Sequence, residues 1–458
     1  MLLDLFSPDA PAVEAPAEQE PKRATAGPLR PKSSSILSPL IADPDGVLFL
    51  DIETTGLSRY YDYVTLIGFG IGGEYNVVLA GEDPQPFLAA LTRARSVVTF
   101  NGSGFDLPFL EDTIPGIEWP RHHVDLRYAC RAIDRTGGQK EIERELGINC
   151  REGIEEVDGA AAVILWHRYM RGDRSALRQL IEYNRADVQA MGLILDHVVS
   201  ERAGADLFLR TDDLRRLCSA TLRRRGTAAL LAPLPSPPTH LRRVVHFVDL
   251  FRGTPAEMAT IVGLDLTGSA ERPSGFAAMR GSVAETATLG TDEAILEAVF
   301  AAAPDLVSID SPLCLPVGRT RVTDDDPTRD EAGIMRVSER ILKKRGINVY
   351  PCLLPSMQRL TERGIRLAQA IRERGIPVIE CYPGAAQDIM GIPRKGAGEE
   401  WLKLGMSEFG VTGPFTFQKV NHDELDAITC CLVGSFHLAG RTEALGGEGE
   451  EPMMVPVI

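Results

Sequence analysis

Residues 46–57 read GVLFLDIETTGL, a hydrophobic strand that ends in two acidic residues. Asp51 and Glu53 are two positions apart, so their side chains leave the same face of a β-strand. Two neighbouring carboxylates repel each other unless a cation lies between them, and a divalent metal ion is a common solution. A solvated strand end produces the same short D-x-E pattern, so the motif needs support from the rest of the chain.

The segments around this strand predict an α/β domain. Residues 63–72 (YVTLIGFGIG) and 75–81 (YNVVLAG) are apolar runs bounded by Gly or charged turn residues, which predicts three adjacent antiparallel strands. A helix is expected over 85–95, followed by strands at 96–100 and near 122–126. Residues 127–200 are predicted to be mostly helical.

Two further acidic segments follow. Asp106 lies in FNGSGFDLPFL, after a turn that contains Asn101 and at the start of an apolar helical stretch. Tyr183 and Asp187 in IEYNRADV are four residues apart and share one face of a helix. Each has an ordinary explanation when taken alone: Asp106 as a helix cap, the pair Tyr183 and Asp187 as an exposed polar face, and Asn101 as a turn former.

Together and in this order, the three segments resemble the DEDD exonuclease superfamily: D-x-E, then N-x-x-x-F-D, then Y-x-x-x-D. The segments VDLRYACR and GGQKEIERELGI extend the resemblance to the YprB-like branch of ribonuclease H-like proteins, over roughly residues 44–200. The resemblance implies a nuclease that cuts DNA or RNA from the 3′ end, with Tyr183 orienting the attacking water and Asn101 as a candidate substrate contact. It also implies two Mg²⁺ or Mn²⁺ ions held by Asp51, Glu53, Asp106 and Asp187.

Asp125 stands beside His122 and His123 at the end of a predicted strand. A metal site is one interpretation. A helix-capping Asp with surface histidines is favoured, because the acidic set is complete without these residues.

The second half repeats the pattern of strand-end acids. ATIVGLDLTGS and DLVSIDSPLCLP each end a buried strand in Asp, at Asp265 and Asp310, and the helical segment HDELDAITCCLVGSF carries Asp423 and Asp426. Two strand acids and one helix acid form the arrangement of a ribonuclease H-type two-metal site. Glu380, in VIECYPG, ends another strand.

These four segments, over roughly residues 258–440, are similar to a large family of uncharacterised proteins predicted to be ribonuclease H-like nucleases. The family pattern runs G-I/L-D, I/V-D-A/S-P, E-x-Y-P and D-x-x-D-A. The resemblance implies catalytic or metal-binding roles for Asp265, Asp310 and Asp426 first, with Glu380 and Asp423 behind them.

Two other interpretations of the second half stay open. GLDLTGS also fits the phosphate-gripping turn of an actin-like, ATP-dependent phosphotransferase. The second interpretation is a domain without catalysis, in which buried, hydrogen-bonded acids only stabilise the fold.

Composition sets the remaining limits. The chain has 458 residues, 44% of them hydrophobic and 25% charged, which predicts two globular domains. Its net charge of -15 argues against general coating of polyanions but leaves local basic contacts possible. Eight cysteines without a C-x-x-C pair indicate reduced thiols rather than a zinc site. Without an apolar run of membrane-spanning length or a signal peptide, we expect a cytoplasmic protein that does not enter membranes.

We therefore predict an α/β protein of two ribonuclease H-like domains, each a mixed five-stranded sheet flanked by helices. The predicted function is a metal-dependent 3′-to-5′ exonuclease that binds nucleic acid; the main rival is a nucleic-acid-binding protein with an inactive nuclease fold. The candidate residues for contacts with the phosphate backbone of a nucleic acid are Arg223, Arg224 and Arg225, although basic segments are usually only solvated. The predicted organisation is a disordered Pro/Ala-rich tail (1–42), the exonuclease-like domain (44–200), a basic helical and Pro-rich linker (201–257), the second domain (258–440) and a loose tail (441–458).

Overall fold

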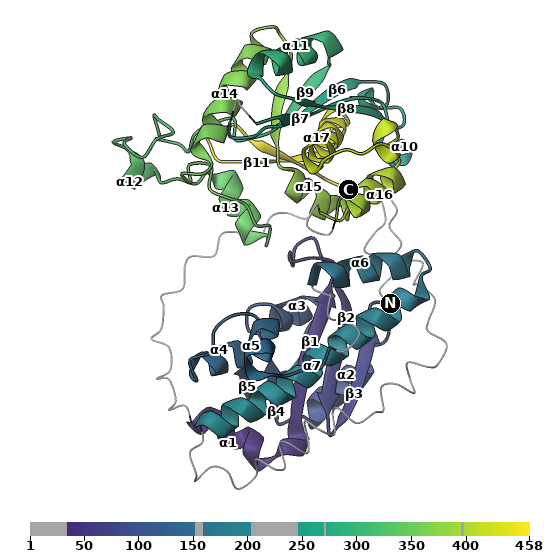
Figure 1. The fold of residues 1–458 in the computed structure, drawn as a ribbon, viewed down its shortest axis with the longest axis vertical. Helices are drawn as coiled ribbons and strands as arrows, with labels where there is room; N and C mark the ends of the chain where they lie inside the picture. Colours follow the sequence, from purple (N-terminus) through teal and green to yellow (C-terminus); the bar gives the residue numbers. More distant parts are fainter. Residues whose placement is uncertain (1–33, 152–158, 203–245, 270–271, 395–397) are drawn as a thin grey trace.

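A computed structural model of the chain describes residues 34–151, 159–202, 246–269, 272–394 and 398–458. They form two α/β units, one above the other in Figure 1. One unit is built on a five-stranded mixed sheet and the other on a seven-stranded mixed sheet. The predicted α/β class with two mixed sheets is confirmed.

The first sheet has the strand order β3-β2-β1-β4-β5. Strands β1, β2 and β3 are antiparallel neighbours, as predicted, and β4 and β5 continue the sheet in parallel with β1. Apolar residues alternate between two buried faces of β1, so this strand forms the centre of the unit. The strands are β1 (Val47–Thr54), β2 (Val64–Ile71), β3 (Glu74–Leu79), β4 (Ser96–Thr99) and β5 (His122–Asp125).

Helices cover both faces of this sheet. The long helix α7 crosses β1 and β2 on one face, while α2 and α3 contribute to the apolar core on the other. The region 127–200, predicted to be mostly helical, contains four helices in its described parts, 126–151 and 159–202. The helices are α1 (Ser34–Ala42), α2 (Gln85–Arg93), α3 (Asp106–Thr113), α4 (Leu126–Arg131), α5 (Gln139–Leu146), α6 (Gly159–Met170) and α7 (Arg174–Arg202), with a short 3-10 turn, η1 (Pro44–Gly46), before β1.

The end of the predicted N-terminal tail is part of the first unit. Residues 34–42 form α1, and Leu37 and Leu40 are buried in the core of this unit. These leucines lie three positions apart and therefore share one helix face. The prediction of a disordered tail rested on the composition of all 42 residues, in which this short apolar segment does not stand out. Residues 1–33 of the predicted tail lie outside the described ranges.

The second sheet has seven strands rather than the predicted five, in the order β11-β12-β10-β9-β6-β7-β8. The additional strands β11 and β12 come from residues 441–458, which the sequence analysis predicts to be loose. That prediction is wrong because Met453 and Val455 are buried, and their apolar segment pairs with β10. The strands are β6 (Thr260–Asp265), β7 (Ser274–Arg280), β8 (Val283–Leu289), β9 (Leu306–Asp310), β10 (Val378–Cys381), β11 (Thr442–Leu445) and β12 (Met453–Pro456).

The predicted C-terminal helix, α17 (His422–Leu438), is almost entirely buried and packs on β6, β7 and β9. Phe247 and Phe251 of α10 join its core, so the last part of the predicted linker belongs to the second unit. Linker residues 203–245, with Arg223, Arg224 and Arg225, lie outside the described ranges. The remaining elements are α10 (Phe247–Phe251), η4 (Pro255–Glu257), α11 (Asp292–Ala302), α12 (Arg329–Ala332), α13 (Val337–Lys344), α14 (Gln358–Arg372), α15 (Pro383–Met390), α16 (Glu399–Phe409) and η6 (Pro414–Thr416).

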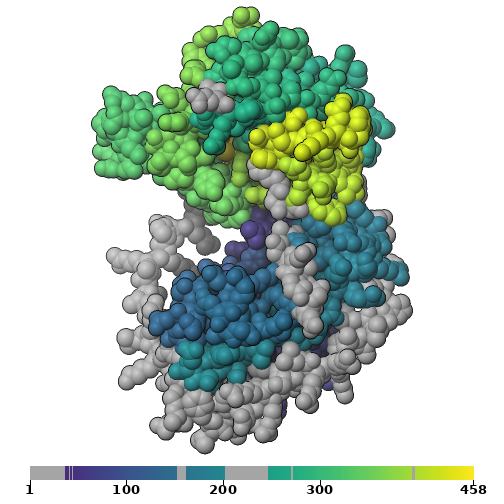
Figure 2. All heavy atoms as spheres, in the orientation of Figure 1, coloured from purple at the N-terminus to yellow at the C-terminus, as the bar shows by residue number. Residues whose placement is uncertain are grey.

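The two units touch at specific contacts. The segment that follows β1 reaches the second unit, where Tyr61 packs against an apolar cluster around Leu342 and Met453. Arg345 donates to the Tyr61 hydroxyl at 2.9 Å, and Ser58 Oγ donates to the backbone carbonyl of Arg345. Figure 2 shows two lobes in contact, and Arg171, directly after α6, forms an ion pair with Glu408 of α16. Strand β1 is therefore connected directly to the interface.

Among the helices of the described ranges, none is both long and apolar enough to span a membrane.

Candidate metal centre

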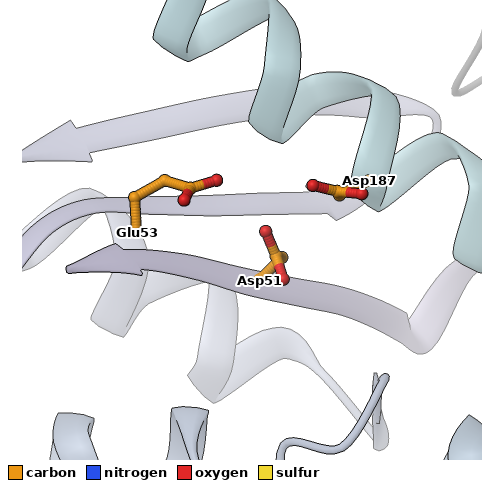
Figure 3. Close-up of side chains that lie close together, drawn as sticks. All are labelled: Asp51, Glu53 and Asp187. Atoms are coloured by element: carbon orange, nitrogen blue, oxygen red, sulfur yellow. The ribbon is translucent and has the colours of Figure 1, made fainter. Parts of the chain in front are cut away.

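Three carboxylates meet where α7 crosses β1. Asp51 and Glu53 leave the same face of β1, and Asp187 of α7 approaches them from above (Figure 3). One oxygen of each lies within 4.8 Å of the others. Hard oxygen ligands at this spacing suit Mg²⁺ or Mn²⁺. The cluster could therefore hold a metal ion.

Asp106 lies beside this triad but its carboxylate is engaged differently. It is the first residue of α3, and its Oδ1 accepts a hydrogen bond from the backbone N–H of Ile52 at 3.1 Å. Ile52 lies between the two acids of β1, so this bond fixes Asp106 against the same strand. The four acids that the sequence analysis selected thus come together, with Asp106 at the edge of the group.

The charges of these acids oppose one another. Burial, followed by the charges of Asp187 and Glu53, raises the pKa of Asp51 well above its usual range. Burial and then Asp187 do the same for Glu53. Burial raises the pKa of Asp106 to about 7. Without a cation the site favours protons, and a divalent ion would relieve the same repulsion.

Arg151 supplies positive charge to this site and was missed by the sequence analysis. It is buried, forms an ion pair with Asp187, and donates to both carboxylate oxygens of Glu143 at 2.8 and 2.7 Å. In the structure its guanidinium therefore balances Asp187. Glu143 belongs to the GGQKEIERELGI segment that supported the resemblance, but no motif pointed to the arginine.

Asn184 holds the acids of β1 from the side of α7. Its Nδ2 donates to Asp51 Oδ2 at 2.7 Å and to Glu53 Oε1 at 3.3 Å, while its Oδ1 accepts from the Tyr75 hydroxyl at 2.8 Å. Gly68 lies opposite Asp51 in the sheet, and a Cβ at Gly68 would lie only 1.5 Å from Asn184 Oδ1. The spacing of three between Asn184 and Asp187, which places them on one helix face, was the available sequence signal.

Tyr183 lies at this site with two cations near its ring. Lys140 Nζ is 4.8 Å and the Arg151 guanidinium 5.6 Å from the ring centroid. Burial, and then the charges of Asp187 and Glu53, raise the pKa of the phenol. The hydroxyl therefore stays protonated at neutral pH. It is able to donate a hydrogen bond without competing for a metal ion.

A glutamine at the start of α5 also supports Asp187. Gln139 Nε2 donates to the backbone carbonyl of Asp187 at 2.9 Å and to Glu143 Oε1 at 3.1 Å. The first of these bonds holds Asp187, in the middle of α7, through its main chain. The glutamine stood in the supporting segment of the sequence analysis without an assigned role.

Asp125 caps a helix, as favoured from the sequence. It accepts from the backbone N–H of Arg127 at 3.1 Å and from that of Asn101 at 2.8 Å. His123 Nε2 lies 2.8 Å from Thr99 Oγ1. Asn101 has a positive φ of 64°, and its Oδ1 accepts from Arg127 at 2.7 Å. Asn101 therefore shapes the turn, and a contact with substrate stays a prediction.

The candidate acids of the second unit are arranged more widely. Asp265 and Asp310 are direct register partners at the ends of the parallel strands β6 and β9. Burial and then Cys381 raise the pKa of Cys430 on α17, one helical turn after Asp426, and the charges of Asp310 and Asp265 add to this shift. No three carboxylates of this described set meet within 4.8 Å, in contrast to the first site.

The two secondary candidates already have partners. Arg336 donates to both oxygens of Glu380 at 2.6 Å, and the backbone N–H of Leu313 adds a third bond at 2.8 Å. Asp423 lies 3.1 Å from His422 Nε2. Glu380 is thus balanced by a buried arginine, and this disfavours it as a metal ligand.

A match to a known protein family supports the fold of the first unit. Residues 48–199 match the RNase H superfamily, so the first unit is an RNase H-like domain. No curated protein matches the chain.

Several solved structures also resemble it. One is the apo form of a nuclease, at 20% identity over 40% of this chain and 86% of that chain, with a TM-score of 0.27. Another is Brucella melitensis NrnC with bound Mg²⁺, at 18% identity over 39% and 84%, with a TM-score of 0.25. The family B DNA polymerase of Pyrobaculum calidifontis aligns at 14% identity over 88% of this chain and 52% of that chain, with a TM-score of 0.28. TM-scores this low give no information about the activity of this chain.

Proposed function

We propose that the first unit is a metal-dependent 3′-to-5′ exonuclease that hydrolyses phosphodiester bonds in DNA or RNA. The observation that carries this proposal is the meeting of Asp51, Glu53 and Asp187 within 4.8 Å. Asp106 lies at the edge of this group, so four acids are available for two Mg²⁺ or Mn²⁺ ions. When bound, such ions activate the attacking water and neutralise charge on the leaving 3′-oxygen.

The neighbouring side chains have distinct tasks in this proposal. Asn184 fixes the carboxylates of Asp51 and Glu53 by donating to both. Tyr183, protonated at neutral pH, orients the attacking water through its hydroxyl. Lys140 lies close enough to this centre to attract an anionic phosphodiester, because its Nζ is 4.8 Å from the Tyr183 ring centroid. Clustered acids with a cation beside them are thus proposed to take one strand end at a time.

The direct test is digestion of short oligonucleotides labelled at either end. With Mg²⁺ or Mn²⁺, we expect the 3′-labelled strand to release labelled mononucleotide first and the 5′-labelled strand to shorten stepwise. Asp51→Asn keeps the shape of the side chain but removes a ligand charge, so we expect at least a roughly hundredfold loss of rate. Glu118→Gln removes an exposed carboxylate of the same unit and is expected to leave the rate unchanged.

A second variant tests the tyrosine. Tyr183→Phe removes only the hydroxyl, and we expect a decrease in kcat of roughly a hundredfold with an unchanged metal dependence. Wild-type protein that releases no product with either metal, or that degrades from the 5′ end, would disprove the proposal.

The ion pair between Arg151 and Asp187 favours one alternative. A guanidinium that permanently replaced a metal ion would leave a nucleic-acid-binding protein with an inactive nuclease fold. Under this alternative, wild-type and Asp51→Asn proteins bind oligonucleotides equally and neither cuts them. Calorimetric titration with Mn²⁺ distinguishes the two, because the exonuclease proposal requires binding that Asp51→Asn weakens.

For the second unit we propose that Asp265, Asp310 and Asp426 form a separate metal-dependent site. The register pairing of Asp265 with Asp310 supports it. Adding Asp265→Asn to the digestion series separates the two units: cutting that only this variant abolishes would assign the activity to the second unit instead.

A further inference from the structure

The second unit contains a cavity of about 730 Å³ near the ends of two inner strands of its sheet. Ligand-binding pockets in proteins typically occupy about 300–1,000 Å³, so the size suits a nucleotide. Its lining combines glycine, proline, hydroxyl and guanidinium groups: Gly268, Ser269, Arg272, Pro355, Ser356 and Arg359.

The cavity lies at the carboxyl ends of the parallel strands β6 and β9. Gly268 follows Asp265, the last residue of β6, by three positions. Arg359 belongs to the other wall of the cavity. Its neighbour Leu360 accepts through its carbonyl a hydrogen bond from the Oγ of Ser311, the residue directly after β9. The carboxyl ends of parallel strands are where open α/β sheets bind ligands. The cavity therefore adjoins the strand ends that carry Asp265 and Asp310.

The lining of the cavity is cationic although the chain carries a net charge of -15. Arg272 and Arg359 are both exposed, and neither forms an ion pair within the ranges that the structure describes. No acidic residue belongs to the described lining. Two guanidinium groups without carboxylate partners, beside two serine hydroxyls, form a donor set that matches phosphate oxygens.

A buried arginine holds one wall of the cavity in place. Arg363 is 4% exposed, and its Nη1 donates to the carbonyls of Thr267 and Ser269 at 2.7 and 3.2 Å and to Ser274 Oγ at 3.1 Å. Its Nε donates to Asp292 at 2.7 Å. This network holds the backbone of Thr267 and Ser269 and the side chain of Ser274. A preorganised wall lowers the entropic cost of binding a ligand.

We propose that this cavity binds a phosphate ester, the phosphate group of a nucleotide or of a nucleic acid end, through Arg272 and Arg359. Ser269 and Ser356 supply further hydrogen bonds. Asp265 and Asp310 lie at the adjoining strand ends, where their carboxylates would hold a divalent cation that offsets the charge of the phosphate. This function is independent of hydrolysis in the first unit.

The test is calorimetric titration of the full chain with AMP and with adenosine, each with and without Mg²⁺. We expect AMP to bind and adenosine to bind at least roughly tenfold more weakly, because charge-assisted hydrogen bonds to phosphate are lost. Arg272→Gln and Arg359→Gln are each expected to weaken AMP binding by roughly tenfold. Arg280→Gln is the matched control, since Arg280 is an exposed arginine at the opposite end of β7 from the cavity.

A 5′-phosphorylated dinucleotide distinguishes the source of the phosphate. Tighter binding than AMP identifies a nucleic acid end, and equal binding identifies a free nucleotide. Arg272→Lys and Arg359→Lys retain the charge and are expected to keep most of the affinity, which separates loss of binding from loss of folding. Equal affinity of wild-type protein and the two glutamine variants, equal affinity for AMP and adenosine, or no AMP binding by wild-type protein would each overturn the proposal.

Discussion

Replacing Asp106 by Asn is expected to stabilise the metal-free protein at neutral and higher pH. Asn retains an Oδ1 that accepts the hydrogen bond of Ile52 N–H, so the substitution removes the charge while keeping this contact. The side chain is 4% exposed, and burial raises its pKa from an ordinary 3.8 to about 7. The native state therefore holds its proton more tightly than the unfolded chain.

The direction of the pH dependence follows from this difference. Between about pH 4 and pH 7 the unfolded chain releases the proton while the native state keeps it, so the free energy of unfolding falls as the pH rises. A shift of about 3 units at about 1.4 kcal/mol per unit corresponds to at most roughly 4 kcal/mol. Wild type and Asp106→Asn are expected to be similar near pH 4. The variant is expected to be more stable above pH 7.

Urea unfolding with EDTA at pH 4.5 and pH 8 measures this effect. Trp119 and Trp166 lie in the first unit, so a Trp401→Phe background makes the fluorescence specific to it. Glu118→Gln, an exposed control, is expected to keep the wild-type pH dependence. At pH 8, Mn²⁺ at a hundredfold excess over its Kd is expected to raise the free energy of unfolding of the wild type by about 2.7 kcal/mol. The gain of Asp106→Asn is expected to be smaller. An unchanged pH dependence in Asp106→Asn would refute the reasoning.

Two further substitutions test the packing around the site and between the units. Gly68→Ala places a Cβ 1.5 Å from the buried Asn184 Oδ1, so we expect a loss of about 1–3 kcal/mol in the free energy of unfolding. Gly138→Ala is the control, because a Cβ there meets nothing within 4 Å. Equal melting temperatures of the two variants would contradict this prediction. Arg345→Ala removes the bond to the Tyr61 hydroxyl and is expected to speed chymotryptic cleavage at Tyr61 by at least roughly tenfold; an unchanged cleavage rate would show that this contact does not hold the segment.

Much of the first site was readable from local patterns. The alternation around Asp51 and Glu53 fixed one strand and one shared face, because side chains repeat every two residues along a strand. The spacing of Tyr183 and Asp187 fixed a helix face in the same way. The resemblance then grouped these residues with Asp106, and the structure brings all of them together.

The errors arose where contacts between distant residues outweigh local composition. Residues 441–458 look loose in the sequence because acidic and glycine residues surround a short apolar segment. In the structure Met453 and Val455 gain burial against the second unit, and this burial stabilises two additional strands. Leu37 and Leu40 join the first core for the same reason.

The sequence by itself determined the order of strands and helices and the positions of the acids, since both follow from periodicity over a few residues. Only the tertiary structure revealed that Arg151 balances Asp187 and that Asn184 bridges Asp51 and Glu53. These groups meet across 36 to 133 residues of chain. The charge balance of the site is set by the packing of α7 and the segment after α5 against β1, and no local pattern encodes that packing.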